Sequence, residues 1–195
     1  SMAVYGNAVD ADESCETKPT SPYGISKLCA ENYVNYLKRV SPDVHAVIFR
    51  IFNCYGPGQD TKNQTQGIAS IFMEQIDKGN RIEVTGDLSR RRDLIYIDDV
   101  VSALKMFLVD EMPCGTYNLC SNESVDISSL IDMIGETSEK NIDDLEKINI
   151  GGVVEDPFIV TGNSKKLMCF GWTPKTSLIN GLKQCWSKKR VNYDQ

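Results

Sequence analysis

The stretch Ser21-Pro22-Tyr23-Gly24-Ile25-Ser26-Lys27 marks the start of a helix and places a tyrosine and a lysine one turn apart. Ser21 suits the N-cap position, and Pro22 suits the first helical position, where its missing N–H does no harm. At about 100° per residue, Tyr23 and Lys27 lie close together in angle and away from the centre of the helix's apolar stripe. The pair is therefore predicted to point away from the main packing surface. The stripe consists of Ile25, Leu28, Cys29, Tyr33, Tyr36, Leu37 and Val40.

The Tyr23 and Lys27 pair has the chemistry of a general base. A phenol in water ionises only near pH 10, and an ammonium group one helical turn away favours the phenolate. A phenolate can take a proton from a substrate hydroxyl. The alternative is an ordinary surface pair, because the Tyr-x-x-x-Lys spacing is common in proteins. The pair alone leaves both interpretations open.

The composition is typical of a globular protein. Of 195 residues, 41% are hydrophobic and 25% are charged, which is enough for one domain with a buried core. The formal net charge of −6 disfavours a nucleic-acid partner, and only Arg90-Arg91-Arg92 forms a dense basic run. Seven cysteines without a Cys-x-x-Cys pair and a single histidine argue against a disulfide framework and a metal site. The same cysteine pattern indicates a reducing compartment. No apolar run approaches the ~18 residues of a membrane helix, so we expect no membrane contact and a cytoplasmic location.

Helical and strand-like segments alternate along the chain, which predicts an α/β fold. Residues 45–52 form a dense apolar run suited to a buried parallel strand, and 53–58 read as the turn-rich loop that ends it. Residues 7–20 read as a surface loop. Further strands are predicted at 82–85, 94–97, 115–119 and 148–150, and further helices at 67–78, 98–109, 127–138, 164–170 and 178–189.

Several short motifs follow one another in a fixed order over essentially the whole chain: Val4-Tyr5-Gly6, Ser21 to Lys27, Arg50 to Pro57, Arg92 to Val100, Tyr117-Asn118-Leu119 and Gly171-Trp172-Thr173-Pro174. This succession resembles the extended short-chain dehydrogenase/reductase family, specifically its NAD-dependent sugar-nucleotide epimerases and dehydratases. The ordered set is far more specific than any single motif in it.

The resemblance implies the C-terminal part of a Rossmann-type doubly wound parallel sheet together with a smaller α/β substrate-binding domain. Residues 1–60 would hold residual Rossmann strands and the catalytic helix. Residues 61–195 would be mainly the sugar-nucleotide region, with some segments returning to the Rossmann part. No two glycines are three residues apart, so the glycine fingerprint of the N-terminal half is expected to be absent from this chain. The uncovered apolar stripe should then favour self-association, so a homo-oligomer such as a dimer is expected.

The resemblance also implies roles for single residues. Tyr23 would be the general base, Lys27 would favour its phenolate, and both would contact the nicotinamide ribose of NAD. Ser1 would hydrogen-bond the sugar hydroxyl as the third catalytic residue. The substrate, a nucleotide-diphosphate sugar, would be bound by Asn53 and Arg92 at the diphosphate, by Gly67 and Ile68 at the nucleotide, and by Asp156 at the ribose. Arg90 and Arg91 receive no role, since a run of arginines is more often a solvated face.

Three departures from the family pattern bear on the substrate and the reaction. Val153 replaces an expected arginine and Thr85 an expected aromatic residue, which leaves the nucleotide open. Met2-Ala3 replaces the Asp-Glu pair of the 4,6-dehydratases, which favours an epimerase or a reductase. We therefore expect NAD-dependent epimerisation of a nucleotide-diphosphate sugar, with a UDP-sugar 4-epimerase as the parent protein. The alternatives are a catalytically inactive fragment or nucleotide-sugar-binding module that does not bind NAD alone, and a nucleotide-sugar reductase or dehydratase.

Overall fold

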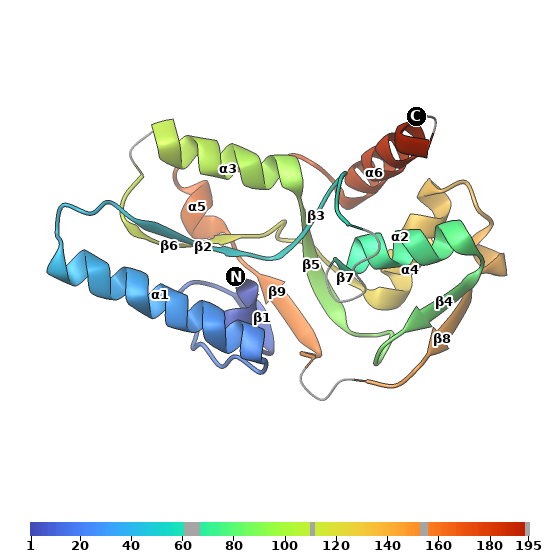
Figure 1. Ribbon diagram of the computed structural model, residues 1–195, viewed down its shortest axis with the longest axis horizontal. Coiled ribbons are helices and arrows are strands. Elements are labelled where there is room, and N and C mark those ends of the chain that lie inside the picture. Colours follow the sequence, from blue (N-terminus) through green and yellow to red (C-terminus); the bar gives the residue numbers. More distant parts are fainter. Residues whose placement is uncertain (61–66, 110–111, 153–155, 194–195) are drawn as a thin grey trace.

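Parallel strands joined by helices make up most of the protein in its computed structural model, which describes residues 1–60, 67–109, 112–152 and 156–193 (Figure 1). The strands are β1 (Ala8–Ala11), β2 (Val47–Ile51), β3 (Asn53–Tyr55), β4 (Arg81–Val84), β5 (Arg91–Tyr96), β6 (Gly115–Leu119), β7 (Ser124–Asp126), β8 (Glu146–Asn149) and β9 (Ile159–Gly162). The helices are η1 (Met2–Val4), α1 (Pro22–Val40), α2 (Ile68–Lys78), α3 (Ile97–Val109), α4 (Ile127–Thr137), η2 (Ile142–Asp144), α5 (Lys165–Met168) and α6 (Leu178–Tyr193).

The strands form three separate sheets. The largest has the order β1-β9-β5-β3, all parallel, with β7 added antiparallel to β5. The other two are the parallel pairs β2-β6 and β4-β8. Parallel neighbours need crossover connections, which explains why helices separate most strands in the sequence. The predicted α/β class with a Rossmann-type parallel sheet is confirmed.

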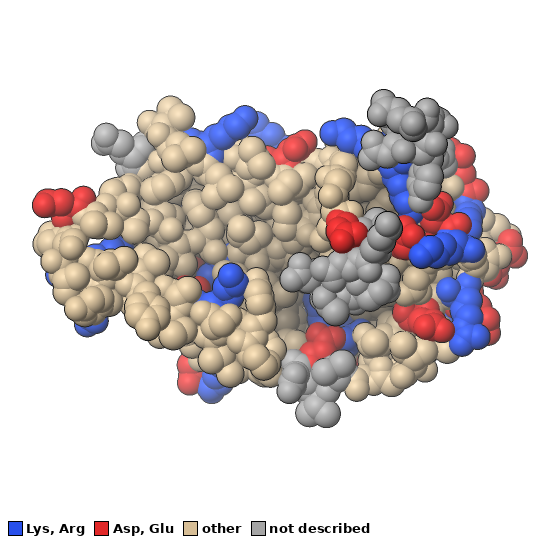
Figure 2. Space-filling model, viewed as in Figure 1, with Lys and Arg blue, Asp and Glu red and all other residues tan. Residues whose placement is uncertain are grey.

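Helix α1 begins where the sequence predicts. The Ser21 hydroxyl accepts a hydrogen bond from the Gly24 amide at 3.1 Å, and Pro22 occupies the first helical position. Gly24 and Glu31 are the buried residues of this helix, so it packs through a narrow edge. Most of the apolar stripe, including Tyr33 and Leu37, is exposed, and the surface over α1 and β2 is mostly uncharged in the view of Figure 2. The self-association expected from this exposure stays a prediction.

Residues 47–55 pass from the β2-β6 sheet to the largest sheet. Strand β2 pairs with β6, and the Phe52 amide still donates to the Leu119 carbonyl at 2.9 Å. Directly afterwards β3 pairs with β5, beginning with Asn53 opposite Leu94. The run therefore crosses the middle of the molecule, as the ribbon of β2 and β3 shows in Figure 1. The prediction that 53–58 is only a turn-rich loop was wrong for its first three residues, because pairing with β5 extends the strand.

Strands β1 and β9, like β7, lie where no strand was predicted. Strand β1 falls in the expected loop 7–20, and β9 falls in a stretch to which no element was assigned. They pair with each other in parallel, and β9 also pairs with β5. Each is four residues long and depends on a partner far away in the chain, so the local pattern carried little signal.

Separate hydrophobic clusters lie in the two halves of the molecule. Side chains of α2, α4 and α6 pack around Ile76, Leu130 and Trp186 in one half. Side chains of β2, β6, α3 and α5 pack around Tyr117 and Trp172 in the other. The division at residue 60 between a Rossmann part and a substrate part stays a prediction.

Among the helices of the described ranges, none has the length and apolar character to cross a membrane.

Candidate active site

A pocket of about 910 Å³ opens between α1, β2, β3 and the start of α2. Its size lies in the range of small-molecule sites in proteins. The residues around it come from five segments of the chain that are separated in sequence, the last of them represented by Leu94. Six of the predicted site residues line it: Ser1, Tyr23, Lys27, Asn53, Gly67 and Ile68.

Tyr23 and Lys27 lie side by side at this pocket. The Lys27 ammonium nitrogen is 5.3 Å from the centre of the Tyr23 ring. The Tyr23 side chain is 53% exposed, so its hydroxyl is open to a ligand and is not used in core packing. The positive charge beside an accessible phenol is the arrangement that proton abstraction from an alcohol needs.

Ser1 is held at the same wall of the pocket by hydrogen bonds to η1 and β2. Its main-chain nitrogen donates to the Phe49 carbonyl of β2 at 3.2 Å, and its hydroxyl accepts from the Ala3 amide at 3.3 Å. Helix α1 approaches η1 closely at Gly24, where a Cβ atom would lie 2.5 Å from the Ala3 carbonyl oxygen. A glycine is therefore required for Tyr23 and Ser1 to share this wall.

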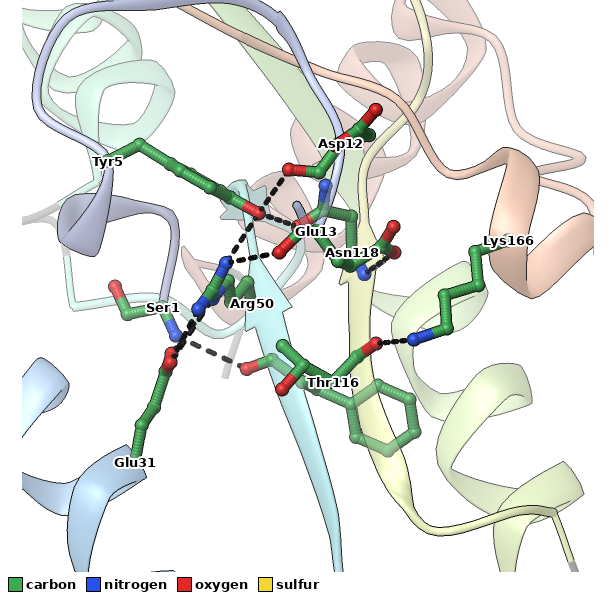
Figure 3. A network of polar contacts seen from close by, with 10 residues as sticks. Ser1, Tyr5, Asp12, Glu13, Glu31, Arg50, Thr116, Asn118 and Lys166 are labelled. Carbon is green, nitrogen blue, oxygen red and sulfur yellow. Dashed lines mark hydrogen bonds and ion pairs between the residues drawn. The ribbon is translucent and has the colours of Figure 1, made fainter. Parts of the chain in front are cut away.

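A buried polar network fixes the depth of α1 below the pocket (Figure 3). Arg50 of β2 donates to both carboxylate oxygens of Glu31 of α1, at 2.7 to 3.2 Å. The third Arg50 nitrogen, Nη1, donates to the Tyr5 hydroxyl at 2.9 Å, and that hydroxyl donates to the Asn118 side-chain oxygen at 2.8 Å. Glu31 shares α1 with Tyr23 and Lys27, so the network positions the helix that carries the candidate base.

The neighbouring wall holds the other predicted residues of the pocket. The Asn53 side-chain amide donates to the Asp93 carbonyl at 2.7 Å, which fixes its orientation at the start of β3. Gly67 caps α2 with a left-handed φ of 81°, and a side chain there would collide with Gln59. Gly67 and Ile68, at the start of α2, both line the pocket.

Arg92 and Asp156 are not among the residues that line the pocket; they bind each other. Arg92 donates to the Asp156 carboxylate at 2.7 Å, and Arg90 forms an ion pair with the second oxygen of the same carboxylate. Arg92 precedes Leu94 by two residues on β5, so their side chains share one face about 7 Å apart, and Leu94 lines the pocket. The Arg92–Asp156 pair thus lies beyond one end of the pocket.

The general expectation that a run of arginines is a solvated face holds for Arg91 and is wrong for Arg90, which was given no role on that ground. Arg90 is 6% exposed and Arg92 is 5% exposed, and only Arg91 between them is exposed. The alternation of buried and exposed residues as the chain enters β5 is the signal that could have distinguished them. Burial, followed by the nearby charge of Arg90, lowers the pKa of Arg92 to about 10.

A family model described as "NAD dependent epimerase/dehydratase family" matches residues 1–120. The chain belongs to this family. The match spans Ser1, Tyr23, Lys27, Asn53 and Arg92, and it confirms the resemblance carried by the sequence motifs.

Relatives of this epimerase/dehydratase chain differ in the reactions for which they are named. A putative UDP-glucose 4-epimerase of Methanocaldococcus jannaschii is 31% identical and covers 95% of this chain and 60% of its own length. A dTDP-4-dehydro-6-deoxyglucose reductase of Escherichia coli is also 31% identical, covering 92% and 56%. The crystal structure of a Thermotoga maritima UDP-glucose 4-epimerase with UDP-glucose has a TM-score of 0.88 at 28% identity, covering 98% and 61%. The chain thus spans about 60% of the length of such relatives.

The residues of the epimerase/dehydratase pocket fit one end of an NAD molecule. Tyr23 and Lys27 present a hydroxyl and an ammonium group suited to the hydroxyls of a ribose, next to the hydroxyl of Ser1. The glycine spacing that holds a dinucleotide diphosphate does not occur within residues 1–195. Among the described residues, His, Cys, Asp and Glu form no cluster of three or more that could hold a metal ion.

Proposed function

We propose that the protein epimerises a nucleotide-diphosphate sugar with NAD, and that its substrate is a UDP-sugar epimerised at the 4-position. The single observation that carries the proposal is the pocket in which Ser1, Tyr23 and Lys27 face the same space as Asn53 and the start of α2. The named activity of the M. jannaschii relative and the UDP-glucose in the T. maritima structure support the choice of sugar nucleotide.

In this proposal Tyr23 is the general base at the sugar. Its phenolate takes the proton of the sugar hydroxyl, and the Lys27 ammonium stabilises the negative charge on the phenolate oxygen. The Ser1 hydroxyl hydrogen-bonds the same sugar oxygen and holds it near Tyr23. When bound, NAD supplies the capacity to accept a hydride and return it, and Tyr23 and Lys27 hold its nicotinamide ribose. The ion pair of Glu31 with Arg50 holds α1, which carries Tyr23 and Lys27, against β2, to which Ser1 is bound.

The nucleotide end of the substrate extends toward α2 and β5. Asn53 and Arg92 contact the diphosphate, because an amide and a guanidinium present N–H donors to phosphate oxygens. The main chain at Gly67 and Ile68 contacts the nucleotide, and Asp156 accepts hydrogen bonds from the ribose. The position of Arg92 two residues from the pocket-lining Leu94 supports this direction.

Replacement of Tyr23 by phenylalanine tests the proposal. In the NAD-loaded protein, we expect Y23F to lower the turnover of UDP-glucose to UDP-galactose by about 100- to 10,000-fold, the range of general-base catalysis. Substrate affinity should stay nearly unchanged, because the ring remains. The matched control is Tyr33→Phe on the same helix, which is 69% exposed and does not line the pocket. Full turnover by Y23F removes Tyr23 from the role of base.

A reductase is the second candidate, and the similarity to the E. coli reductase favours it. A reductase consumes one reduced nicotinamide per product, whereas an epimerase returns the hydride and leaves the nicotinamide pool unchanged. Absorbance at the nicotinamide band during turnover therefore separates the two reactions. If the 195-residue chain retains no NAD and shows a thermal shift only with a UDP-sugar, the chain by itself is a binding module, and no shift with either ligand makes it an inactive fragment.

A further inference from the structure

Arg90 and Arg92 place two buried guanidinium groups against one carboxylate. The two arginines are almost completely buried, whereas the Asp156 side chain between them is 37% exposed. Each Asp156 oxygen contacts one of the two arginines. Two positive charges facing one negative charge leave the cluster with an excess of one positive charge. A buried excess charge is unfavourable, and a further anion would relieve it.

Main-chain acceptors hold both guanidinium groups in place. Arg90 donates to the carbonyls of Thr85 and Asp87, and Arg92 donates to the carbonyls of its neighbour Arg91 and of Phe158. These carbonyls are neutral, so they orient the donors without cancelling the charge. Pre-oriented donors lose little freedom when they bind a ligand.

Two other described carboxylates near the cluster, Asp87 and Asp93, form no ion pair with its guanidinium groups, although the charge of Asp87 raises the pKa of Arg90 against the larger lowering by burial. The Asp87 carboxylate is exposed and accepts hydrogen bonds from Ser89. The Asp93 carboxylate belongs to the opposite face of β5 and accepts from the Ser121 amide and hydroxyl. The Asp156 carboxylate is the one in direct contact with both guanidinium groups within the described residues, and it is also open to solvent.

We propose that Arg90 is a second phosphate-binding residue beside Arg92, and that the Asp156 carboxylate is an internal counter-ion which a diphosphate displaces. The ligand class is the diphosphate of a nucleotide sugar, so the inference deepens the proposed function and rests on it for the identity of the sugar. A diphosphate carries enough charge to pair with both guanidinium groups at once. Once displaced, the Asp156 carboxylate is free to accept hydrogen bonds from the ribose of the same ligand.

A purely structural role makes a different prediction for the same contacts. If Arg90 only ties the 85–87 turn to Asp156, its loss changes stability and leaves anion affinity unaltered. Inorganic pyrophosphate distinguishes the two roles, because it has the diphosphate without base, ribose or sugar. UDP provides the second probe, since it adds the nucleoside.

The test is calorimetric titration of the full chain with pyrophosphate and with UDP. We expect Arg90→Gln to weaken both affinities about tenfold or more, since it removes charge-assisted hydrogen bonds to phosphate. Arg91→Gln is the matched control: it removes the same charge one position away, where the side chain is exposed and bonds Ser124. Its affinities should stay within about twofold. Equal affinities for R90Q and wild type, or absence of pyrophosphate binding by wild type, overturn the proposal.

Asp156→Asn tests the displacement separately. Removal of the competing carboxylate should tighten pyrophosphate binding several-fold, and unchanged or weaker binding contradicts its role as a displaceable counter-ion. If R90Q does not fold, Arg90→Lys is the second variant, because it keeps the positive charge. We expect it to weaken pyrophosphate binding by about twofold to tenfold, less than R90Q, and to leave the salt dependence of binding intact. Loss of that salt dependence in R90K contradicts the charge argument. If pyrophosphate binding depends on Arg90 but the protein shows no epimerase turnover, the role of Arg90 in phosphate binding is supported and the proposed epimerase function is contradicted.

Discussion

Two buried arginine sites in this protein differ in how their charge is compensated. Below α1, Arg50 faces Glu31, and both side chains are less than a tenth exposed. At the end of β5, Arg90 and Arg92 share Asp156, whose side chain is open to solvent. The first site balances one cation with one anion, whereas the second holds an excess cation. A balanced pair holds the structure together, and an unbalanced one is suited to receive an anionic ligand.

The largest effect should come from removal of the Glu31 charge, because it leaves the buried Arg50 without its counter-ion. We expect Glu31→Gln to lower the free energy of unfolding by about 3–5 kcal/mol. Urea unfolding followed by circular dichroism measures the change. The control is Glu16→Gln, which breaks a surface ion pair with Lys18 in which both side chains are more than two-thirds exposed. That variant should change stability by about 1 kcal/mol or less.

A loss below about 1 kcal/mol in E31Q would contradict the view that the Arg50 site is a structural pair. The same variant also reports on the candidate base, because Glu31 and Tyr23 share α1. We expect reduced turnover in E31Q even at temperatures where the variant stays folded, since the helix is then free to shift.

A smaller effect should come from Asp93, which lies one residue after Arg92 but faces away from the cluster. Burial raises the pKa of the Asp93 carboxyl to about 6, above its usual value of 3.8. A raised pKa means that the folded state binds a proton which the unfolded state releases between these two values, so this group favours folding more as pH falls through about 6. From about pH 7.5 to about pH 5, wild type should gain about 1 kcal/mol relative to Asp93→Asn.

Unfolding curves of wild type and D93N at several pH values test this prediction. All other titratable groups are the same in the two proteins, so their contributions cancel in the difference between the two free energies of unfolding. A difference that stays constant with pH would show that Asp93 does not titrate in this range. It would also weaken the distinction between Asp93 and the arginine cluster, since Asp93 would then be paired with a positive charge.

The smallest stability effect should come from Asp156→Asn. Solvent screens the partly exposed Asp156 carboxylate, so its loss should lower the free energy of unfolding by about 1 kcal/mol or less. Added pyrophosphate should restore that stability in D156N, because a ligand that binds only the folded state stabilises it. Thermal unfolding with and without pyrophosphate measures the restoration. An effect of D156N as large as that of E31Q would remove the contrast between the two sites.

The parts of the site that depend on neighbours in the chain could be predicted from the sequence. The Ser21 cap, the helix that follows it and the shared face of Tyr23 and Lys27 all arise within a few turns of one helix. The strand at 115–119 was predicted from its local pattern and is confirmed as β6. The catalytic and substrate roles of these residues stay predictions, as does the division of the chain at residue 60.

The parts that depend on pairing between distant segments could not be predicted. Strands β1 and β9 are short and become strands by pairing with each other. The shift of the chain at Phe52 from β6 to β5 needs both partner strands in place. Neither feature has a local pattern, because hydrogen bonds between strands satisfy main-chain groups regardless of which side chains lie between them.

The sequence by itself determined that Tyr23 and Lys27 share one face of a helix that begins at Ser21, since caps and helical spacing act over a few residues. Only the tertiary structure decided that Arg90 and Arg92 are buried on one carboxylate while Arg91 between them is exposed. The physical reason is that a charged side chain can be buried only where the fold brings a counter-ion to it, and Asp156 comes from a distant part of the chain.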